Sequence, residues 1–205
     1  MVYETKVKLT FITDCLGSSS NDPDIHRRYI ASKAPDAKSL EEEVAAIGVD
    51  GVEELQKTVF PKTDDGTPFF WDYQIKGFFK DACSALQRCK GNDVAKESLK
   101  IKSFKKIIDG NVFISTRKIK VVMPEGGTIG ERSRSLRAST AQGERIALAS
   151  SETIPSGSTL EFTIQNLNKD IENAIIEWLD YGKFKGLGQW RNAGWGRFTY
   201  EILDT

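Results

Sequence analysis

The feature that most constrains what this chain can fold into is a glycine-rich stretch near its C-terminus, Gly186–Gly196. It consists of a glycine-apolar-glycine triplet, five further residues, and a second triplet of the same form. The glycines permit positive φ angles and a close approach of the backbone to a ligand, and successive backbone N–H groups in such a turn can form an anion-binding concavity. Arg191 adds a permanent cation whose planar fork suits phosphate. Trp190 and Trp195 offer ring faces on which a base can stack.

The residues on either side of this stretch predict the elements that it connects. Apolar residues before it recur at helical spacing, and Gly182 has the position of a helix C-terminal cap. Residues 197–203 alternate as a strand does. We therefore expect a loop between the last helix and the last strand. Two interpretations stay open, because the loop either binds a ligand or is an ordinary glycine-rich connection.

Length and composition are those of a globular chain. The 205 residues fit one domain spanning 1–205, and the hydrophobic share of 39% is enough for a packed core. No apolar run approaches the ~20 residues of a membrane span, so we expect no membrane association. The three cysteines are odd in number and show no Cys-x-x-Cys spacing, which favours reduced thiols in a cytoplasm.

Charge is distributed unevenly along the chain although the formal net charge is zero. Residues 36–54 are strongly acidic, whereas residues 100–145 are rich in lysine and arginine. Such asymmetry predicts a face for a polyanion. Two ordinary solvated surfaces would give the same pattern, so charge alone does not separate the two.

The order of apolar patterns predicts a mixed α and β fold. A first strand is expected at 5–13, followed by a partly helical insertion at 17–67 and a helix at 71–88. Next we expect a hairpin of 101–108 and 112–122 around Asp109-Gly110, and an exposed basic loop, arm or hairpin at 124–145. Strands at 146–154 and 159–164 and the final helix precede the last strand. Without the insertions this is β-α-β-β-α-β, the ferredoxin-like (RRM-like) plan. We predict an α+β, ferredoxin-like fold in which two helices cover one face of a four-stranded antiparallel sheet.

Several stretches, in the right order, resemble the CRISPR-associated RAMP superfamily. The glycine-rich stretch matches that family's C-terminal loop, including its basic residue. Residues 66–80 resemble the family's entry into its first helix, although Asp72-Tyr73-Gln74 stands where the family has Gly-Ser-Ser. Residues 152–162 resemble a strand pair of the family, Leu16-Gly17-Ser18 resembles its first glycine-containing loop, and the basic arm lies where the family's backbone subunits carry a β-hairpin thumb.

The resemblance implies a guide-RNA-binding backbone subunit, or a relative of one, in a system of antiviral defence. Such a protein would hold single-stranded RNA by its phosphate backbone and assemble with other CRISPR-type subunits or with itself. The residues that the resemblance and the residue types assign to RNA are Gly186, Gly188, Trp190, Arg191, Gly194, Gly196, Lys76, Lys80, Arg132, Arg134 and Arg137. For Lys76 and Lys80, one helical turn apart, a solvated helix face is the alternative.

Two other functions stay open from the sequence. His26 could act as general base or acid in a metal-independent endoribonuclease, and Asp22 and Asp24 lie where some backbone subunits place an aspartate that cleaves target RNA with a metal ion. A protein-interaction module that mimics or caps a CRISPR complex is the second alternative, and the acidic segment 36–54 favours it. No cluster of residues has metal-ligand spacing, so we expect no cofactor and no bound metal.

Overall fold

The computed structural model of the protein describes residues 1–21, 57–89, 91, 95–140 and 143–203, and only the backbone of residues 136–140 and 143–148. The three weak catalytic candidates, Asp22, Asp24 and His26, lie outside the described residues, as do the acidic segment 36–54 and most of the predicted insertion.

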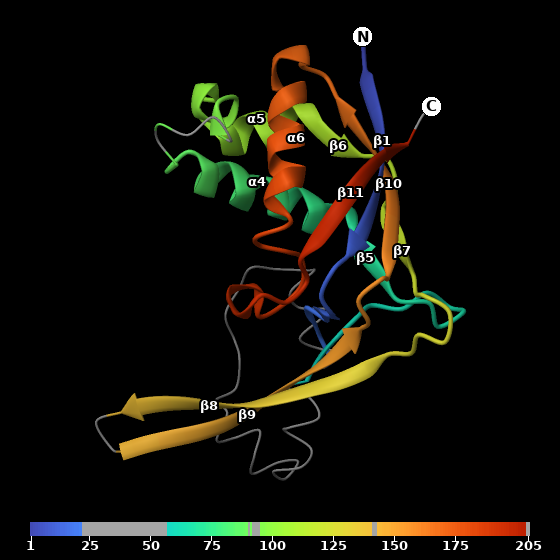
Figure 1. Ribbon diagram of the computed structural model, residues 1–205, viewed down its shortest axis with the longest axis vertical. Helices are drawn as coiled ribbons and strands as arrows, with labels where there is room; N and C mark the ends of the chain where they lie inside the picture. Colours follow the sequence, from blue (N-terminus) through green and yellow to red (C-terminus); the bar gives the residue numbers. More distant parts are fainter. Residues whose placement is uncertain (22–56, 90, 92–94, 141–142, 204–205) are drawn as a thin grey trace.

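A six-stranded sheet organises the described part of the chain (Figure 1). Its strand order is β11-β1-β10-β7-β5, with β6 also pairing with β10, and every pairing is antiparallel. The alternation in the first strand buries Val7, Leu9 and Phe11 on one face. The strands are β1 (Tyr3–Phe11), β5 (Phe69–Trp71), β6 (Val112–Ile114), β7 (Lys118–Val122), β10 (Thr159–Asn166) and β11 (Phe198–Leu203).

Three α-helices lie on one face of this sheet, as Figure 1 shows: α4 (Asp72–Leu86), α5 (Phe104–Asn111) and α6 (Glu172–Tyr181). In α4 the apolar residues recur every three or four positions and are buried, which turns one stripe of the helix to the sheet. The side-chain oxygen of Gln74 accepts a hydrogen bond from the backbone N–H of Trp71 at 2.7 Å and so fixes the start of α4. Short 3-10 helices are η2 (Ser98–Lys100), η3 (Lys169–Ile171) and η4 (Arg191–Ala193).

A second sheet has the order β2-β9-β4-β3, with β8 pairing with β9. Its strands are β2 (Cys15–Leu16), β3 (Ser19–Ser20), β4 (Thr58–Val59), β8 (Gly130–Thr140) and β9 (Gly143–Ile154). The hairpin of β8 and β9 extends well beyond the rest of the sheet and lies beneath the helices and the first sheet in Figure 1.

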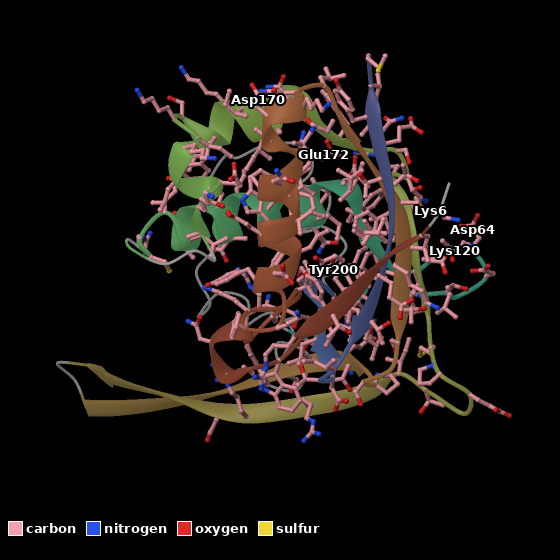
Figure 2. All side chains as sticks on the ribbon, turned by 45° about the horizontal axis from the view of Figure 1, so that its top comes forward. Lys6, Asp64, Lys120, Asp170, Glu172 and Tyr200 are labelled. Atoms are coloured by element: carbon pink, nitrogen blue, oxygen red, sulfur yellow. The ribbon has the colours of Figure 1, made fainter. Side chains whose placement is uncertain are left out.

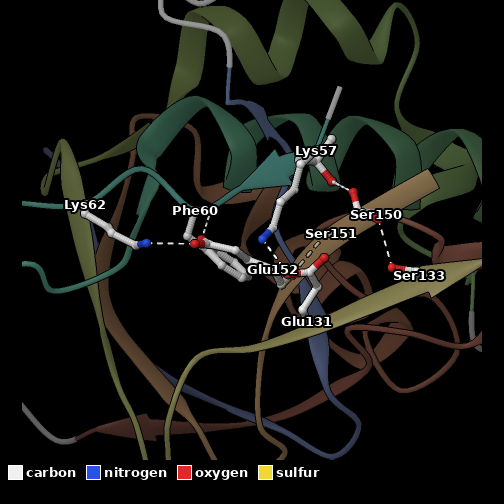
Figure 3. Close-up of polar contacts among 9 residues, drawn as sticks. Lys57, Phe60, Lys62, Glu131, Ser133, Ser150, Ser151 and Glu152 are labelled. Carbon is white, nitrogen blue, oxygen red and sulfur yellow. Dashed lines mark hydrogen bonds and ion pairs between the residues drawn. The ribbon is translucent and has the colours of Figure 1, made fainter. Parts of the chain in front are cut away.

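The base of this hairpin is fixed to residues 57–62 by charged side chains (Figure 3). The Glu152 carboxylate accepts a hydrogen bond from the backbone N–H of Phe60 at 3.0 Å and pairs with Lys62 Nζ at 2.7 Å. Lys57 Nζ pairs with Glu131 at 2.5 Å. The Glu152 side chain is only 13% exposed, so water screens its ion pair less than it screens most surface pairs. These contacts fix the position of the base of β8 relative to residues 57–62.

Two expectations about elements need correction, and one choice between alternatives is decided. Residues 104–111 form helix α5 and not a strand, because Phe104, Ile107 and Ile108 meet the core at helical spacing and Lys80 of α4 pairs with Asp109. The Asp109-Gly110 pair therefore lies in a helix and not in a hairpin turn.

For the basic segment, which the sequence allows as a loop or a hairpin, the structure shows the hairpin: residues 130–140 form strand β8, which pairs with β9. Residues 131–135 are all exposed, so neither face of the strand needs apolar side chains. The sequence there shows no apolar alternation that would predict a strand. Finally, the first sheet has six strands and not four, because Ser115, Thr116 and Arg117 separate β6 from β7 and β5 adds an edge. Among the helices described here, none is long and apolar enough to cross a membrane.

Candidate nucleic-acid interface

The glycine-rich stretch is a loop that connects α6 to β11, as the sequence predicts. Its backbone has positive φ at Gly188, Gly194 and Gly196, and also at Trp190, where φ is 51°. A positive φ at a bulky residue costs free energy and is maintained only by surrounding structure. Here that structure is the segment 12–16, which follows β1.

Hydrogen bonds hold the loop on this segment. The backbone N–H of Gly196 donates to Asp14 O at 2.8 Å, that of Gln189 to Leu16 O at 3.3 Å, and Thr13 Oγ1 to Gly194 O at 3.1 Å. Because β2 pairs in turn with Ile154 and Thr153 of β9, the loop and the hairpin share one support.

The close approach that the loop glycines allow is to the protein's own backbone. A Cβ added at Gly186 would lie 1.6 Å from Gly196 O, one at Gly196 would lie 1.9 Å from Leu187 O, and one at Gly188 would lie 2.3 Å from Leu16 O. At Gly194 the nearest atom is at 3.0 Å, at the far end of the Arg197 side chain. Internal packing therefore already requires three of the four glycines, whether or not a ligand binds. Gly182 is the C-cap residue of α6, as the sequence predicts. Its φ is −57°, so a left-handed backbone is not the reason for glycine there. The reason is packing, because a side chain at this position would collide with the Phe198 ring.

Cys15 lies buried beneath the loop. Its thiol donates to Leu187 O, with Sγ and O 3.4 Å apart. Burial raises the pKa of this thiol well above its usual range, so it stays protonated near neutral pH. Cys15 is therefore a packing residue with a weak hydrogen bond and not a nucleophile.

Two arginines of β8 lie over the two tryptophans of the loop. The Arg134 guanidinium is 4.6 Å from the ring centroid of Trp190, and the Arg132 guanidinium is 4.9 Å from that of Trp195. The two arginines are two positions apart, so they share one face of the strand and are spaced by about 6.6 Å along it. Two regions that the sequence suggested separately, the basic arm and the glycine-rich loop, thus form one surface. We call it the hairpin–loop surface, made of Arg132, Arg134, Lys185, Trp190, Arg191 and Trp195.

Acidic side chains balance only part of the positive charge on this surface. Arg132 is 3.5 Å from Asp14, while Arg191 and Lys185 share Asp81 of α4, at 2.8 and 3.6 Å. Arg134 has no carboxylate partner among the described residues. Counted over the described residues, the surface has four cations beside two carboxylates, an excess of positive charge that attracts an anion.

A shallow pocket of about 340 Å³ opens on this surface. Arg134 and Lys185 contribute cations to its lining, Trp190 contributes a ring, and Gln189 and Asn192 contribute amides. Amide groups can hydrogen-bond the edge of a base, and an arginine stacked on a ring keeps its N–H groups free for phosphate. The arrangement suits a nucleotide unit of a single strand.

Comparison with known proteins gives matches among solved structures. No family model matches the chain, and no curated protein matches it. The fold is shared with a chain of the type III-B Cmr-beta structure. That structure is of Cmr-beta bound to cognate target RNA, and the match has a TM-score of 0.55 and 15% identity, covering 99% of this chain. The protein spans only 59% of the length of that chain.

Two further matches have lower TM-scores. Cmr6 from Pyrococcus furiosus matches with a TM-score of 0.49 and 11% identity, over 98% of this chain and 99% of Cmr6. A chain of a type IV-B CRISPR complex matches with a TM-score of 0.48 and 11% identity, over 99% and 91%. At such identities the Cmr-beta match establishes the mixed α+β fold with antiparallel sheets and nothing finer.

The two predicted RNA-binding lysines, Lys76 and Lys80, lie apart from the hairpin–loop surface. Lys76 donates to Asp109 O at 3.3 Å and lies 4.9 Å from the Phe113 ring centroid, and Lys80 pairs with Asp109 at 2.5 Å. Both side chains therefore extend from α4 toward α5 and β6. Arg137 pairs with Ile146 in the hairpin ladder, and only its backbone is described.

Sequence reasoning missed three residues of the surface or of its support: Lys185, Asp81 and Asp14. Lys185 directly precedes the loop, so a wider window around the motif would have included it. Asp81 lies in the middle of α4 and Asp14 just after β1, and nothing in the sequence links either to an arginine more than 100 residues away. Across the described residues, no group of three histidine, cysteine or acidic side chains is arranged to hold a metal ion.

Proposed function

We propose that the protein is a CRISPR-associated, RAMP-type RNA-binding protein that holds single-stranded RNA on the hairpin–loop surface. The observation that carries the proposal is the contact of Arg134 with Trp190 and of Arg132 with Trp195. It joins cations and rings from two distant parts of the chain. Among the described residues, the carboxylates beside them, Asp14 and Asp81, are fewer than the cations. The fold shared with an RNA-bound Cmr-beta structure supports the same proposal.

The chemistry of the surface favours backbone recognition of a single strand. Arginine N–H groups contact phosphates, and such contacts supply affinity that falls with salt and carry little sequence information. Tryptophan rings add stacking, which tolerates every base because each base has a flat face. A double-stranded RNA would offer neither splayed bases nor access to its deep major groove.

The finer assignment follows from the same features. We propose that β11, β1, β10 and the β6–β7 segment, with α4 and α6, are the ferredoxin-like core of one domain spanning 1–205. In that arrangement the β8–β9 hairpin is the counterpart of a backbone-subunit thumb. The RNA would be a guide RNA, and other CRISPR-type subunits or further copies of the chain would be the protein partners.

Fluorescence anisotropy with a labelled single-stranded RNA at rising salt tests the RNA-binding proposal. Wild-type protein should bind at low salt and lose affinity steeply as salt increases. The Arg132→Ala/Arg134→Ala double variant should bind more weakly, and its salt slope should fall by about 1.4, or about 0.7 for each lost phosphate contact on a single strand.

Lys6→Ala is the matched control, because it removes an exposed cation from β1. Lys6 pairs with Thr163 and Leu203, and Figure 2 shows it well away from the hairpin. This variant should bind as the wild type does. No wild-type binding at low salt, or equal losses in the control and the double variant, would refute the proposal.

A further inference from the structure

A second group of rings and cations lies at the opposite edge of the six-stranded sheet from β11. Phe69, Trp71 and Tyr73 occupy alternate positions from β5 into the first turn of α4, and we call them the aromatic ladder. Phe69 and Trp71 meet edge to face, with centroids 4.8 Å apart. Trp71 and Tyr73 are nearly parallel, with centroids 6.2 Å apart and 14° between the planes. Phe69 is buried whereas Tyr73 is 46% exposed, so the ladder ends at the surface with a ring.

Two cations contact the ladder directly. Lys118 Nζ lies 5.4 Å from the Phe69 centroid and 5.8 Å from that of Trp71, and the Arg117 guanidinium lies 5.5 Å from that of Trp71. The register explains this, because Trp71 is directly opposite Lys118 in the β5–β7 pair. Lys118 forms no ion pair with any described residue. Arg117 pairs with Asp72 at 3.3 Å but remains 71% exposed, so it can also reach a ligand.

The indole N–H of Trp71 gives a second indication that the ladder accepts a ligand. It is the one buried side-chain donor or acceptor, within the described part of the chain, that has no hydrogen-bond partner. Burying a donor without a partner costs about 1–3 kcal/mol, so native structures seldom keep one without a reason. Neighbouring atoms cover Nε1, so a polar ligand atom reaches it only after the Trp71 side chain shifts.

We infer that the aromatic ladder is a base-stacking site for single-stranded RNA, with Tyr73 as the stacking ring and Lys118 and Arg117 as contacts to the flanking phosphates. The inference rests on the proposed function and adds a second place where the same strand is held. Asp72 occupies the first turn of α4 and disfavours an anion there, so the contact at Tyr73 is to a base and not to a phosphate. The two cations against the rings suit a stacked base with its flanking phosphates.

The segment after β1 connects this site to the hairpin–loop surface. The side-chain amide of Gln74 in α4 donates to Ser18 Oγ at 2.6 Å, and Gln189 in the loop donates from its backbone N–H to Leu16 O at 3.3 Å. Residues 16–18 therefore contact both the start of α4 and the glycine-rich loop, so the supports of the two surfaces are joined.

The experiment combines single-residue variants with RNAs that each lack one base. Wild-type protein, Tyr73→Ala, Tyr73→Phe and Phe113→Ala are compared by anisotropy on a series of single-stranded RNAs with one abasic position moved along the strand. Phe113→Ala is the matched control, since Phe113 is 41% exposed and also carries a lysine over its ring, but lies on β6. Thermal unfolding of each variant confirms that it is folded.

Tyr73→Ala should weaken binding of the intact RNA about 5- to 150-fold, the range of one base–aromatic stack. Tyr73→Phe and Phe113→Ala should change it little, and the salt slope should stay the same in all three because no phosphate contact is lost. Removing one particular base should weaken wild-type binding by the same factor and should have no further effect in Tyr73→Ala.

Three results would overturn the inference. They are unchanged RNA binding by Tyr73→Ala, a loss in Tyr73→Ala that no abasic position reproduces in the wild type, and an equal loss in Phe113→Ala. In the first of these outcomes, Tyr73→Ala binds RNA as the wild type does while Arg132→Ala/Arg134→Ala still binds more weakly. That result would leave the RNA-binding proposal intact and make the ladder a structural or protein-contacting group. Absence of wild-type binding would instead overturn the RNA-binding proposal itself.

Discussion

Alanine substitutions at three glycines separate the two physical reasons for glycine in this chain. Gly126 has a φ of +72° and open space where a Cβ would lie. Gly186 does not have a positive φ, but its Cβ would lie 1.6 Å from Gly196 O. Gly188 combines both demands, with a φ of +80° and a Cβ 2.3 Å from Leu16 O. The three substitutions therefore test backbone conformation alone, close packing alone, and the two together.

The expected losses of stability follow from these distances. The left-handed conformation costs an L-residue about 1–2 kcal/mol, which is the whole effect expected for Gly126→Ala. Forced overpacking costs about 1–3 kcal/mol or occasionally more, and a Cβ against backbone puts Gly186→Ala at about 3 kcal/mol or above. Gly188→Ala carries both costs and should lose about 2–5 kcal/mol.

Urea-induced unfolding, followed by circular dichroism with the m-value checked for each variant, measures these differences. Thermal unfolding should agree, with a shift of roughly 2–4 °C per kcal/mol for a chain of this size. Equal stabilities of Gly188→Ala and Gly126→Ala would refute the reasoning, because the loop could then not be packed on Leu16 as described.

Three further predictions concern single residues. Arg191→Ala should leave the melting temperature nearly unchanged, since a part-exposed ion pair with Asp81 contributes less than about 1 kcal/mol. It should lower the salt slope of RNA binding by about 0.7. A large drop in melting temperature with intact RNA binding would make Arg191 structural. In a thiol assay on the folded protein only Cys89 should react quickly, because burial raises the pKa of Cys83 to about 11 and raises that of Cys15 further; fast reaction of all three thiols would contradict this. RNA incubated with the protein, with or without magnesium, should stay intact, and cleavage that His26→Ala abolishes would identify an endoribonuclease instead.

The sequence predicts the elements that bury a regular apolar stripe. Strands β1 and β11 and helices α4 and α6 lie close to where alternation and helical spacing place them. Residues 104–111 were misread because Asp109-Gly110 is a strong hairpin signal, and only packing against α4 decides for a helix. The residue pattern left a loop and a hairpin open for residues 130–140, because that strand is solvated on both faces near its base and so carries no apolar pattern.

The candidate site was predictable only in its parts. The glycines, Trp190 and Arg191 belong to a local motif, and Arg132 and Arg134 to a local run of charge. Their meeting depends on how β2 joins the loop to β9 and on how Glu152 fixes the hairpin base, and both are tertiary contacts between distant residues. The contact of Lys118 with the aromatic ladder likewise depends on the β5–β7 register, which no pattern within residues 69–73 specifies.

Cross-linking tests the central claim most directly, because it locates the RNA on the protein. A single-stranded RNA carrying a photoreactive base is bound to the full chain and irradiated, and the attached peptides are identified by mass spectrometry. The account predicts cross-links in peptides from the loop at 186–196 and from the base of β8 at 130–135, and their loss in Arg132→Ala/Arg134→Ala. Cross-links confined to other parts of the chain, or equally abundant in the double variant, would contradict it.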